Sequence, residues 1–508
     1  MTVEGLERLV DFYAAGSQLA GLAFCVNMQR ALFGSSVWET LIDDYDPALG
    51  DDQPALRRSG EARGMAALRR NGANQFKVWV DRARHHGIEA FLTMRMNDCH
   101  GLEGHGDFWS GHRSRGTDQG HFSSHATEFW KSRPDLRRAP YRYERSFEGA
   151  FNYAEKEVQA HHLALIAEVM DRYDMDGFEL DWMRWIFMFR PGFEAEGRQV
   201  LCGFLEKVLE IKRIAEKKWG HPIQLRHRIP AEPQTCLALG FDVPAWVDMG
   251  AADQIILSCF GSATNFDYPI ALWRRLVGKQ TKILALVESI ARPYPGSAVD
   301  SYHFLFAAAS AALERGADGV YLFNECYGEP YPGGRRELLC QMLNTLGSPD
   351  TLANVVRRHA VAYPQVRAAG EGIRTSLPVP LTNAHIGVDP GRWAENVTVR
   401  LAVGRKVESA RHILRLGFSG DTILEALRKI TFRVNAEPVS ICEAPAYPDC
   451  MPKAFPTRDN AEFPEQVAQT LHFEIPYEIL KNDVNVVEFE PLPGPGQLEW
   501  AEILVIPV

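Results

Sequence analysis

The chain has 508 residues, of which 46% are hydrophobic and 24% are charged. This composition excludes an intrinsically disordered chain, a collagen-like fibre and a coiled coil. The formal net charge of -10 at pH 7 argues against a nucleic-acid partner, because a negative protein surface repels the phosphate backbone.

Residues 1–20 carry charged side chains at helical spacing, which predicts a helix rather than the apolar core of a signal peptide. The sequence has no uninterrupted apolar run of about 18 residues, so we expect no membrane span or membrane partner. The nine cysteines form no C-x-x-C pair and no cluster at zinc-like spacing. Free thiols of this kind favour a reducing compartment, and we expect a cytoplasmic protein.

Short apolar runs alternate with helical stretches from the start of the chain to about residue 350. Seven runs are expected to be strands, at residues 22–27, 88–96, 177–182, 223–229, 254–259, 283–288 and 319–324. Helices are expected at 74–86, 155–173, 194–218 and 301–315, where apolar residues recur at three-four spacing. This alternation predicts parallel strands that are joined by helical crossovers.

Eight such units need about 250 residues, so we predict an α/β fold with a (β/α)8 TIM-like barrel over residues 1–355. The eighth strand is expected between residues 30 and 85 or between 125 and 150. An open doubly wound sheet is the alternative. Because no G-x-G-x-x-G follows the first strand, the sequence gives no support for a dinucleotide site.

Past residue 355 the helical pattern gives way to prolines and short strands. We expect a linker over residues 356–375. The expected strands beyond it lie at 397–403, 412–418, 430–434, 471–475, 484–489 and 498–506. They predict a C-terminal antiparallel β-sandwich over residues 376–508, an accessory domain that packs on the barrel and does not catalyse.

The third expected strand carries two carboxylates, Glu179 and Asp181. Because side chains of a strand alternate between its faces, both point the same way, toward the barrel axis. Buried like charges are costly, and stability alone does not explain them, so both residues are candidate catalytic groups. The alternative for each is a buried ion pair with a neighbouring arginine.

Residues 153–173 followed by D-G-F-E-L-D at 176–181 resemble the fourth-strand region of glycosyl-hydrolase-like barrels related to family 10. The stretches R-M-N-D-C-H at 95–100 and R-H-R-I-P at 226–230 fit the same group. The strand is also similar to the D-G-x-D-x-D-W-E motif of family 18 chitinases. There, however, Met183 stands in place of the acid glutamate and Glu179 in place of an aspartate, which argues against chitinase chemistry.

A glycosidase needs two carboxyl groups, and the second should follow another strand. Glu288 ends the apolar run 282–288 and is the preferred partner of Asp181, while Glu325 is the competing candidate. The alternative for Glu288 is a cap on the next segment. The resemblance to barrels with an acid after strand four and a nucleophile after strand seven implies Asp181 as acid/base, Glu288 as nucleophile and retention of the anomeric configuration.

Polar and aromatic residues near strand ends are expected to bind substrate: Asn27, Arg95, Asn97, Asp98, His100, Trp182, Arg184, Arg226, Arg228, Asn324 and Glu325. The arginines match carboxylate or sulfate groups, so an acidic carbohydrate is among the expected substrates. Alternatively, they only orient Glu179 and Asp181, and Trp182 belongs to the core. The histidine-rich loop 99–137 is expected to be a lid without a metal site, because a third ligand of clear spacing is missing.

These features predict a glycoside hydrolase that cleaves an oligo- or polysaccharide by a two-carboxylate mechanism without a cofactor. The sequence leaves open whether the chain forms a homo-oligomer. One alternative is a carbohydrate-binding barrel that has lost catalysis, and the other is a metal-assisted barrel lyase or isomerase.

Overall fold

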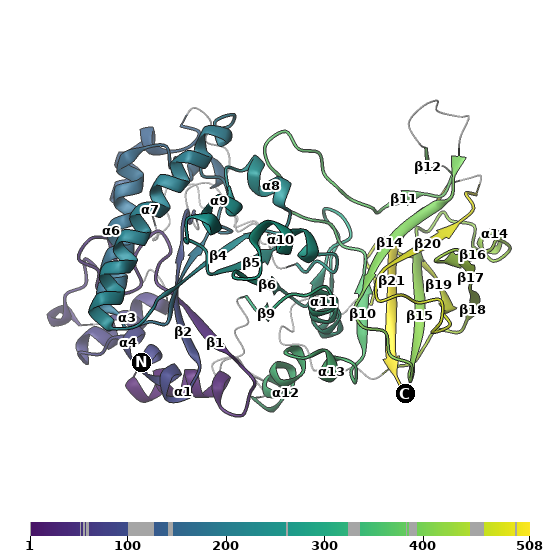
Figure 1. Ribbon diagram of the computed structural model, residues 1–508, viewed down its shortest axis with the longest axis horizontal. Coiled ribbons are helices and arrows are strands. Elements are labelled where there is room, and N and C mark those ends of the chain that lie inside the picture. Colours follow the sequence, from purple (N-terminus) through teal and green to yellow (C-terminus); the bar gives the residue numbers. More distant parts are fainter. Residues whose placement is uncertain are drawn as a thin grey trace. The chain divides into compact units, whose positions relative to one another are not determined.

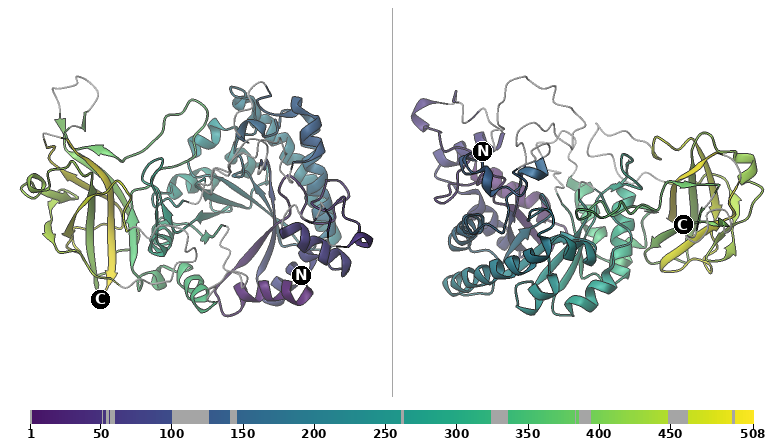
Figure 2. Two further views of the ribbon diagram at one scale, coloured as in Figure 1. Left: turned by 180° about the vertical axis from the view of Figure 1, so that it is seen from behind. Right: turned by 90° about the horizontal axis from the view of Figure 1, so that it is seen from above.

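A computed structural model describes the chain from residue 2 to residue 508 (Figures 1 and 2). The residues that it does not describe within this range are 51, 54–55, 57–59, 100–125, 141–145, 261–262, 324–335, 383, 386–393, 448–461 and 493–494. The described residues form a mixed α/β protein with two compact units.

A curled parallel sheet of seven strands has the order β1-β2-β3-β4-β5-β6-β9. The strands are β1 (Gly21–Cys25), β2 (Glu89–Arg95), β3 (Gly177–Asp181), β4 (Gln224–Pro230), β5 (Gln254–Ser258), β6 (Lys282–Leu286) and β9 (Gly319–Tyr321). Each overlaps one of the seven expected runs, so these predictions are confirmed. The described parts of residues 30–85 and 125–150 add no eighth strand to this sheet, and closure into a complete barrel stays a prediction.

The first unit comprises Met1–Ile256, Leu276–Lys282 and Ala368–Gly370. Its helices are α1 (Val3–Ala14), α3 (Gly60–Arg70), α4 (Gln75–His85), α5 (Glu128–Ser132), α6 (Lys156–Arg172), α7 (Glu194–Trp219), α8 (Pro233–Ala238) and α9 (Val243–Asp248). The expected helices at 74–86, 155–173 and 194–218 are confirmed. In Figure 1, α6 and α7 run side by side.

Helix α4 shows how local sequence sets the ends of these elements. Its first turn is capped by the Asn74 side chain, which accepts hydrogen bonds from the backbone N–H groups of Phe76 and Lys77. After the helix, Gly87 takes a φ of 70°, a left-handed conformation that glycine adopts without steric cost. The chain can therefore turn at once into β2.

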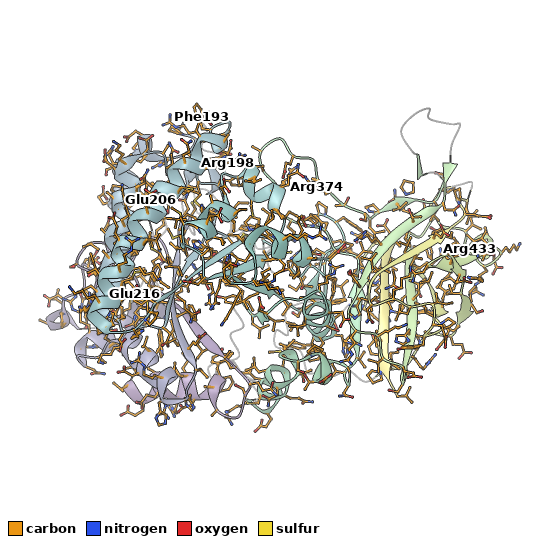
Figure 3. The ribbon with its side chains drawn as sticks, viewed as in Figure 1. Phe193, Arg198, Glu206, Glu216, Arg374 and Arg433 are labelled. Carbon is orange, nitrogen blue, oxygen red and sulfur yellow. The ribbon has the colours of Figure 1, made fainter. Side chains whose placement is uncertain are left out.

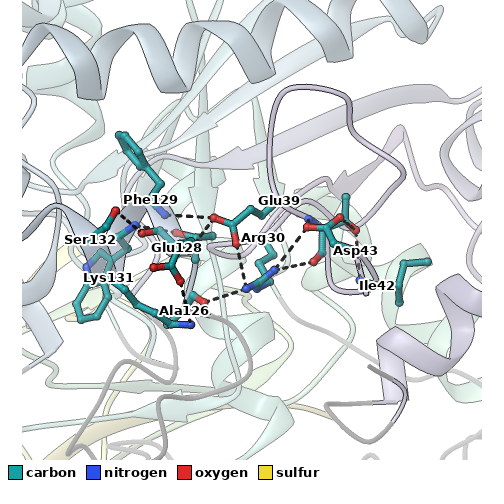
Figure 4. Close-up of polar contacts among 12 residues, drawn as sticks. Arg30, Glu39, Ile42, Asp43, Ala126, Glu128, Phe129, Lys131 and Ser132 are labelled. Atoms are coloured by element: carbon teal, nitrogen blue, oxygen red, sulfur yellow. Dashed lines mark hydrogen bonds and ion pairs between the residues drawn. The ribbon is translucent and has the colours of Figure 1, made fainter. Parts of the chain in front are cut away.

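An ionic network fixes the segment that begins at Ala126 to the loop after β1 (Figure 4). Glu39 Oε1 accepts hydrogen bonds from the backbone N–H groups of Glu128 at 2.7 Å and Phe129 at 3.2 Å. Arg30 Nη2 lies 3.1 Å from Glu39 Oε2 and donates to the Ala126 carbonyl at 3.1 Å. The start of α5 is therefore anchored within the first unit.

The second unit comprises Leu257–Arg275, Ile283–Arg367 and Glu371–Val508. It contains most of α10 (Ile270–Val277), together with α11 (Tyr302–Glu314), α12 (Arg336–Leu346), α13 (Pro349–Leu352) and α14 (Leu424–Leu427). Two short strand pairs also belong to it: β7 (Ile290–Ala291) with β8 (Val299–Asp300), and β12 (Ala384–His385) with β13 (Ala394–Glu395). The expected helix at 301–315 is confirmed as α11. Within the stretch expected as a linker, β10 (Arg357–Ala360) is a buried strand.

Two antiparallel sheets form the C-terminal part of this unit. One has the order β10-β21-β15-β19-β18, with β11 beside β21, and the other has the order β14-β20-β16-β17. Their bounds are β11 (Val379–Pro380), β14 (Val397–Val403), β15 (Ala410–Phe418), β16 (Phe432–Val434), β17 (Glu437–Pro438), β18 (Ser440–Cys442), β19 (Gln469–Glu474), β20 (Asp483–Phe489) and β21 (Gln497–Pro507). In β14, Val397 and Val399 are buried and alternate with exposed Thr398 and Arg400. The apolar faces of the two sheets share one core, which confirms the predicted antiparallel strands.

Buried histidines make the fold sensitive to acid. Burial lowers the pKa of His162 and of His227 to about 4, and it lowers the pKa of His359 well below its usual value. An unfolded histidine takes up a proton near pH 6.5. Between about pH 6.5 and pH 4 the unfolded chain therefore binds more protons than the folded one, and the free energy of unfolding falls as the pH falls.

We expect the urea midpoint of unfolding to decrease from pH 7 to pH 5. A His359→Phe variant should show a shallower pH dependence than the native chain, whereas His85→Gln, a change at an exposed position on α4, should leave it unchanged. A midpoint that stays constant or rises on acidification would contradict this prediction.

Candidate functional site

Three neighbouring strands place polar and charged side chains in two layers on one face of the sheet. In the Cα register of β2, β3 and β4, the lower layer consists of Thr93, Glu179 and Arg226, and the upper layer consists of Arg95, Asp181 and Arg228. Alternate residues of a strand face the same side, so both layers point in one direction. The upper layer lies at the carboxyl ends of β2 and β3, the edge at which parallel α/β sheets carry their active sites.

The lower layer is a hydrogen-bonded network around one buried ion pair. Glu179 is completely buried. Thr93 Oγ1 donates to Glu179 Oε1 at 2.8 Å, and Arg226 Nε donates to Glu179 Oε2 at 2.8 Å. The Arg226 guanidinium also lies 3.8 Å from the centroid of the Phe91 ring, a favourable cation–π distance. Glu179 thus forms the buried ion pair that the sequence left as an alternative.

Thr93 and Phe91 were not singled out in the sequence. The two-residue spacing from Arg95 predicts that Thr93 shares its face, and this signal could have identified it. Phe91 is different, because its contact with Arg226 depends on how β2 and β4 lie in space and has no local sequence signal.

Gly177 makes room for this arrangement. A Cβ atom at residue 177 would lie 2.1 Å from Cε1 of Phe91, so any side chain there would displace the ring that supports Arg226. We expect Gly177→Ala to lower the free energy of unfolding by about 1 to 3 kcal/mol, the range for overpacked cores. Urea unfolding would measure the change.

The matched control is Gly203→Ala in α7. A Cβ atom at residue 203 meets nothing within 4 Å, and alanine favours a helix more than glycine does. This variant should keep or increase the stability. Equal effects of the two alanine substitutions would contradict the steric account of Gly177.

The upper layer centres on Asp181, whose side chain is 2% exposed. Arg228 donates from Nε to Asp181 Oδ1 at 2.8 Å and from Nη2 to Oδ2 at 2.9 Å. The backbone N–H of Met183 donates to Oδ1 at 3.0 Å. Three donors therefore converge on the two oxygens of this carboxylate, and the two bonds from Arg228 are charge-assisted. Oδ1 has two donors and Oδ2 has one, so Oδ2 has more capacity for another contact.

Two further arginines lie close to this pair. Arg95 Nη1 donates to Asp98 Oδ2 at 2.8 Å, and the Asp98 side chain is fully buried. Arg184 follows β3 and is 7% exposed. Burial lowers the pKa of Arg184 to about 10, and the positive charges of Arg95 and Arg228 contribute to the decrease. The upper layer is therefore a dense group of desolvated charges.

Asn27 and Asn97 use their amides to hold the backbone. Asn27 Oδ1 accepts from the Arg95 backbone N–H at 2.9 Å, and Asn27 Nδ2 donates to the Arg95 carbonyl at 3.0 Å. Asn97 makes the same kind of double contact with Phe151, accepting at 2.8 Å and donating at 2.9 Å. These two residues fix the ends of β1 and β2, next to the charged layer.

Trp182 directly follows β3 and packs in the core, on the face of the sheet opposite to Glu179 and Asp181. Its Nε1 donates to His227 Nδ1 at 3.0 Å, and its ring contacts the rings of Phe204 from α7 and Trp246 from α9. His227 Nε2 lies 2.7 Å from the Ala251 carbonyl. The neutral histidine thus bridges Trp182 to the backbone, and Trp182 has the core position that the sequence left open.

The second candidate carboxylate, Glu288, follows β6 in the second unit and is 8% exposed. It lies near Tyr268, whose hydroxyl donates to the Leu286 carbonyl at 2.6 Å. Burial raises the pKa of Tyr268, and the charges of Cys259 and Glu288 raise it further. Glu288 therefore sits in a largely desolvated environment.

Several predicted features lie outside the described residues: His100, Asn324, Glu325 and the other histidines of the long loop. Across the part of the chain that the structure describes, no three His, Cys, Asp or Glu side chains are placed to hold a metal ion. In the same residues, no helix has the length and apolar character that crossing a membrane requires.

No protein-family model matches the chain, and no curated protein matches it. Solved structures of glycoside hydrolases are similar to it at low identity. An alpha-L-fucosidase isoenzyme 2 from Paenibacillus thiaminolyticus has a TM-score of 0.38 and 12% identity, over 68% of this chain and 45% of that one. An alpha-fucosidase of Thermotoga maritima has a TM-score of 0.34 and 11% identity, over 95% of this chain and 78% of that one. A family 18 N-acetylglucosaminidase from Paenibacillus barengoltzii has a TM-score of 0.33 and 11% identity, over 68% of this chain and 95% of that one. This chain therefore spans less than half of the first of these proteins.

Proposed function

We propose that the chain is a glycoside hydrolase that cleaves an oligo- or polysaccharide, with Asp181 as its ionised catalytic carboxylate. The observation that supports this most is the contact of Asp181 with two nitrogens of Arg228 at the carboxyl end of β3. This contact fixes the orientation of the carboxylate at the edge where a substrate would bind. A carboxylate with these properties suits a nucleophile or a base.

We assign Asp181 the role of the nucleophile and Glu288 the role of the acid. The resemblance to barrels with an acid after strand four and a nucleophile after strand seven implies the reverse assignment, with Asp181 as the acid and Glu288 as the nucleophile. An acid must carry a proton, and a proton on Asp181 would replace its favourable interaction with Arg228. Glu288, which follows β6, then takes the role of the proton donor. Glu325 is the competing candidate for this role.

The proposed reaction has two steps. Asp181 Oδ2 attacks the anomeric carbon while the bond to the leaving oxygen breaks, and Glu288 gives its proton to that oxygen. Water then attacks the anomeric carbon of the glycosyl ester while the bond from that carbon to Asp181 Oδ2 breaks, Glu288 takes up a proton of the water, and the Asp181 carboxylate is regenerated. Two inversions retain the anomeric configuration. We also propose that the parallel sheet belongs to a closed (β/α)8 barrel of the family-10-like kind.

Glu179 has a different proposed role from Asp181. Its two oxygens are bound to Thr93 and Arg226 one layer below the strand ends. We propose that it is a positioning residue that holds Arg226 and the β3 backbone in place, and that it does not touch the substrate.

A second candidate function is carbohydrate binding without catalysis. The observation that favours it is the low exposure of the Asp181 side chain, 2%, because an attacking oxygen must reach the anomeric carbon. In this alternative the Asp181–Arg228 pair is structural, and the upper layer only contributes to a sugar-binding surface.

The test is a product analysis on aryl glycosides and on neutral and acidic polysaccharides, by mass spectrometry and chromatography. We expect hydrolysis by the native chain and by a Glu206→Gln control, since Glu206 is exposed on α7 (Figure 3), and loss of hydrolysis in Asp181→Asn. Glycan binding without hydrolysis by the native chain would contradict the proposed function and support the second candidate. Activity that a chelator abolishes would instead indicate the metal-assisted lyase or isomerase.

A further inference from the structure

Two side-chain contacts join β3 to β4 at neighbouring positions, one on each face of the sheet. Asp181 contacts Arg228 on the face that carries the charged layers. Trp182 follows Asp181 in the chain and His227 precedes Arg228. On the opposite face, Trp182 Nε1 donates to His227 Nδ1 at 3.0 Å. The ion pair and the contact between the two rings are therefore only one residue apart on both strands.

The His227 ring is completely buried and uses both of its nitrogens. An indole N–H can only donate, so Nδ1 of His227 is an acceptor and Nε2 carries the proton. Nε2 then donates to the Ala251 carbonyl, 2.7 Å away in the segment before β5. Burial lowers the pKa of His227 to about 4, which favours this neutral form at pH 7. His227 thus connects β4 to Trp182 on one side and to the approach of β5 on the other.

The tryptophan partner of His227 is held firmly in the core. Trp182 is completely buried, and its ring contacts four other aromatic rings, those of Tyr153, Phe204, Phe241 and Trp246. Its backbone N–H donates to the Arg228 carbonyl at 3.2 Å. A shift of β3 against β4 would break the bond between the two rings and leave buried polar nitrogens without partners, which is costly. The register of the two strands is therefore fixed from the face that lies away from the charged layers.

We propose that His227 is a positioning residue for the candidate catalytic carboxylate, Asp181. Through its hydrogen bond to Trp182 it keeps β3 and β4 in the register that places Arg228 against that carboxylate. His227 itself does not touch the substrate, because its side chain lies on the opposite face of the sheet. The inference rests on the proposed function, since it concerns the orientation of the same carboxylate. A displacement of about 1 Å at a reacting group can lower a rate about 10²-fold, so a contact on the far face can act on the rate.

The experiment compares two substitutions that each keep one of the two histidine contacts. The asparagine amide reaches the position of Nδ1, so His227→Asn can still accept from Trp182. The glutamine amide reaches the position of Nε2, so His227→Gln keeps only the contact with the Ala251 carbonyl. We expect His227→Gln to lower kcat by up to about 10²-fold with KM unchanged, and His227→Asn to retain most of the native kcat. Steady-state kinetics of the full chain on an aryl glycoside that it cleaves would measure both.

Trp246→Phe is the matched control. Trp246 in α9 packs against the rings of both Trp182 and His227, and its Nε1 has no hydrogen-bond partner within the described part of the chain. The substitution therefore loosens the same core without removing the bond between β3 and β4. It should lower the urea midpoint of unfolding, as His227→Gln does, but leave kcat close to the native value. Trp182→Phe, which removes the indole N–H, should reproduce the loss of kcat and replaces His227→Gln in the comparison if that variant does not fold.

A second readout does not need enzymatic activity. The Nε–H group of Arg228 donates to Asp181 Oδ1 at 2.8 Å, so its proton NMR resonance reports on the ion pair. We expect His227→Gln to shift this resonance, and His227→Asn and Trp246→Phe to leave it in place.

Two results would overturn the inference. One is an equal loss of kcat in His227→Gln, His227→Asn and Trp246→Phe, which would show that only the integrity of the core matters. The other is a His227→Gln variant with native kcat and an unshifted Arg228 resonance. The proposed function can fail separately: a native chain that cleaves no glycan would contradict the hydrolase, while the Arg228 resonance would still test the positioning. Cleavage that depends on Asp181 but not on His227 would support the hydrolase and contradict the positioning role.

Discussion

Asp181→Asn is expected to lower kcat by about 10²- to 10⁴-fold or more, the range typical of a lost acid–base group and a lower bound for a lost nucleophile. Asparagine has nearly the same shape and keeps one oxygen that can accept from Arg228. It lacks the negative charge and cannot form the glycosyl ester on which the proposed mechanism depends. The effect should therefore fall on the chemical step, with a smaller change in KM.

The measurement is steady-state kinetics on an aryl glycoside that the native chain cleaves, with near-ultraviolet circular dichroism to show that the variant is folded. Glu179→Gln is the informative comparison. Because Glu179 lies one layer below and contacts Thr93 and Arg226, its loss should reduce stability more than it reduces kcat. Near-native turnover by a folded Asp181→Asn variant would remove Asp181 from the mechanism.

Glu502→Ala is expected to lower the free energy of unfolding by about 3 to 5 kcal/mol, the cost of breaking a buried ion pair on one side. Glu502 in β21 is completely buried. Arg358 Nε donates to its Oε2 at 2.9 Å, and Arg415 Nε donates to its Oε1 at 2.7 Å. Burial acts to raise the pKa of Glu502, but Arg358 and Arg415 outweigh it and lower the pKa to about 2. Removing the carboxylate would leave two buried guanidiniums without their shared partner.

Urea unfolding of Glu502→Ala and of a matched exposed pair would measure the effect. Glu474 contacts Arg411 at 2.8 Å, but both side chains are more than 40% exposed, so Glu474→Gln should cost less than about 1 kcal/mol. A triple variant with methionine at positions 358, 415 and 502 should recover much of the loss, because it leaves no buried charge. A Glu502→Ala variant within about 1 kcal/mol of the native chain would contradict this account.

The seven parallel strands could be predicted because each is a short apolar run between helical stretches. The end of α4 is equally local, since Asn74 and Gly87 specify where the helix begins and where the chain turns. The common face of Glu179 and Asp181 follows from the two-residue spacing alone. These features depend on residues that are close together in the chain.

The partners of Glu179 and Asp181 could not be predicted in the same way. Whether Arg226 or Arg228 meets a given carboxylate depends on the register between β3 and β4, which are more than forty residues apart in the chain. The same reason explains β10. The run R-R-H at 357–359 is typical of a polar linker. In the structure, however, Arg357 is buried against Ser310, and Arg358 is buried against Glu502. Distant residues provide the charge and hydrogen bonds that make burial of these side chains tolerable.

The most direct test of the central claim is to trap the glycosyl ester on the full-length chain. The native protein would be incubated with an activated 2-fluoro glycoside of a sugar that it hydrolyses, a compound that slows the second step of a retaining mechanism. Peptide mass spectrometry then locates the label. We predict one added fluorosugar on the peptide that contains Asp181, and a first-formed product of retained configuration by proton NMR. A label on Glu288, or no label together with an inverted product, would contradict the assignment of Asp181 as the nucleophile.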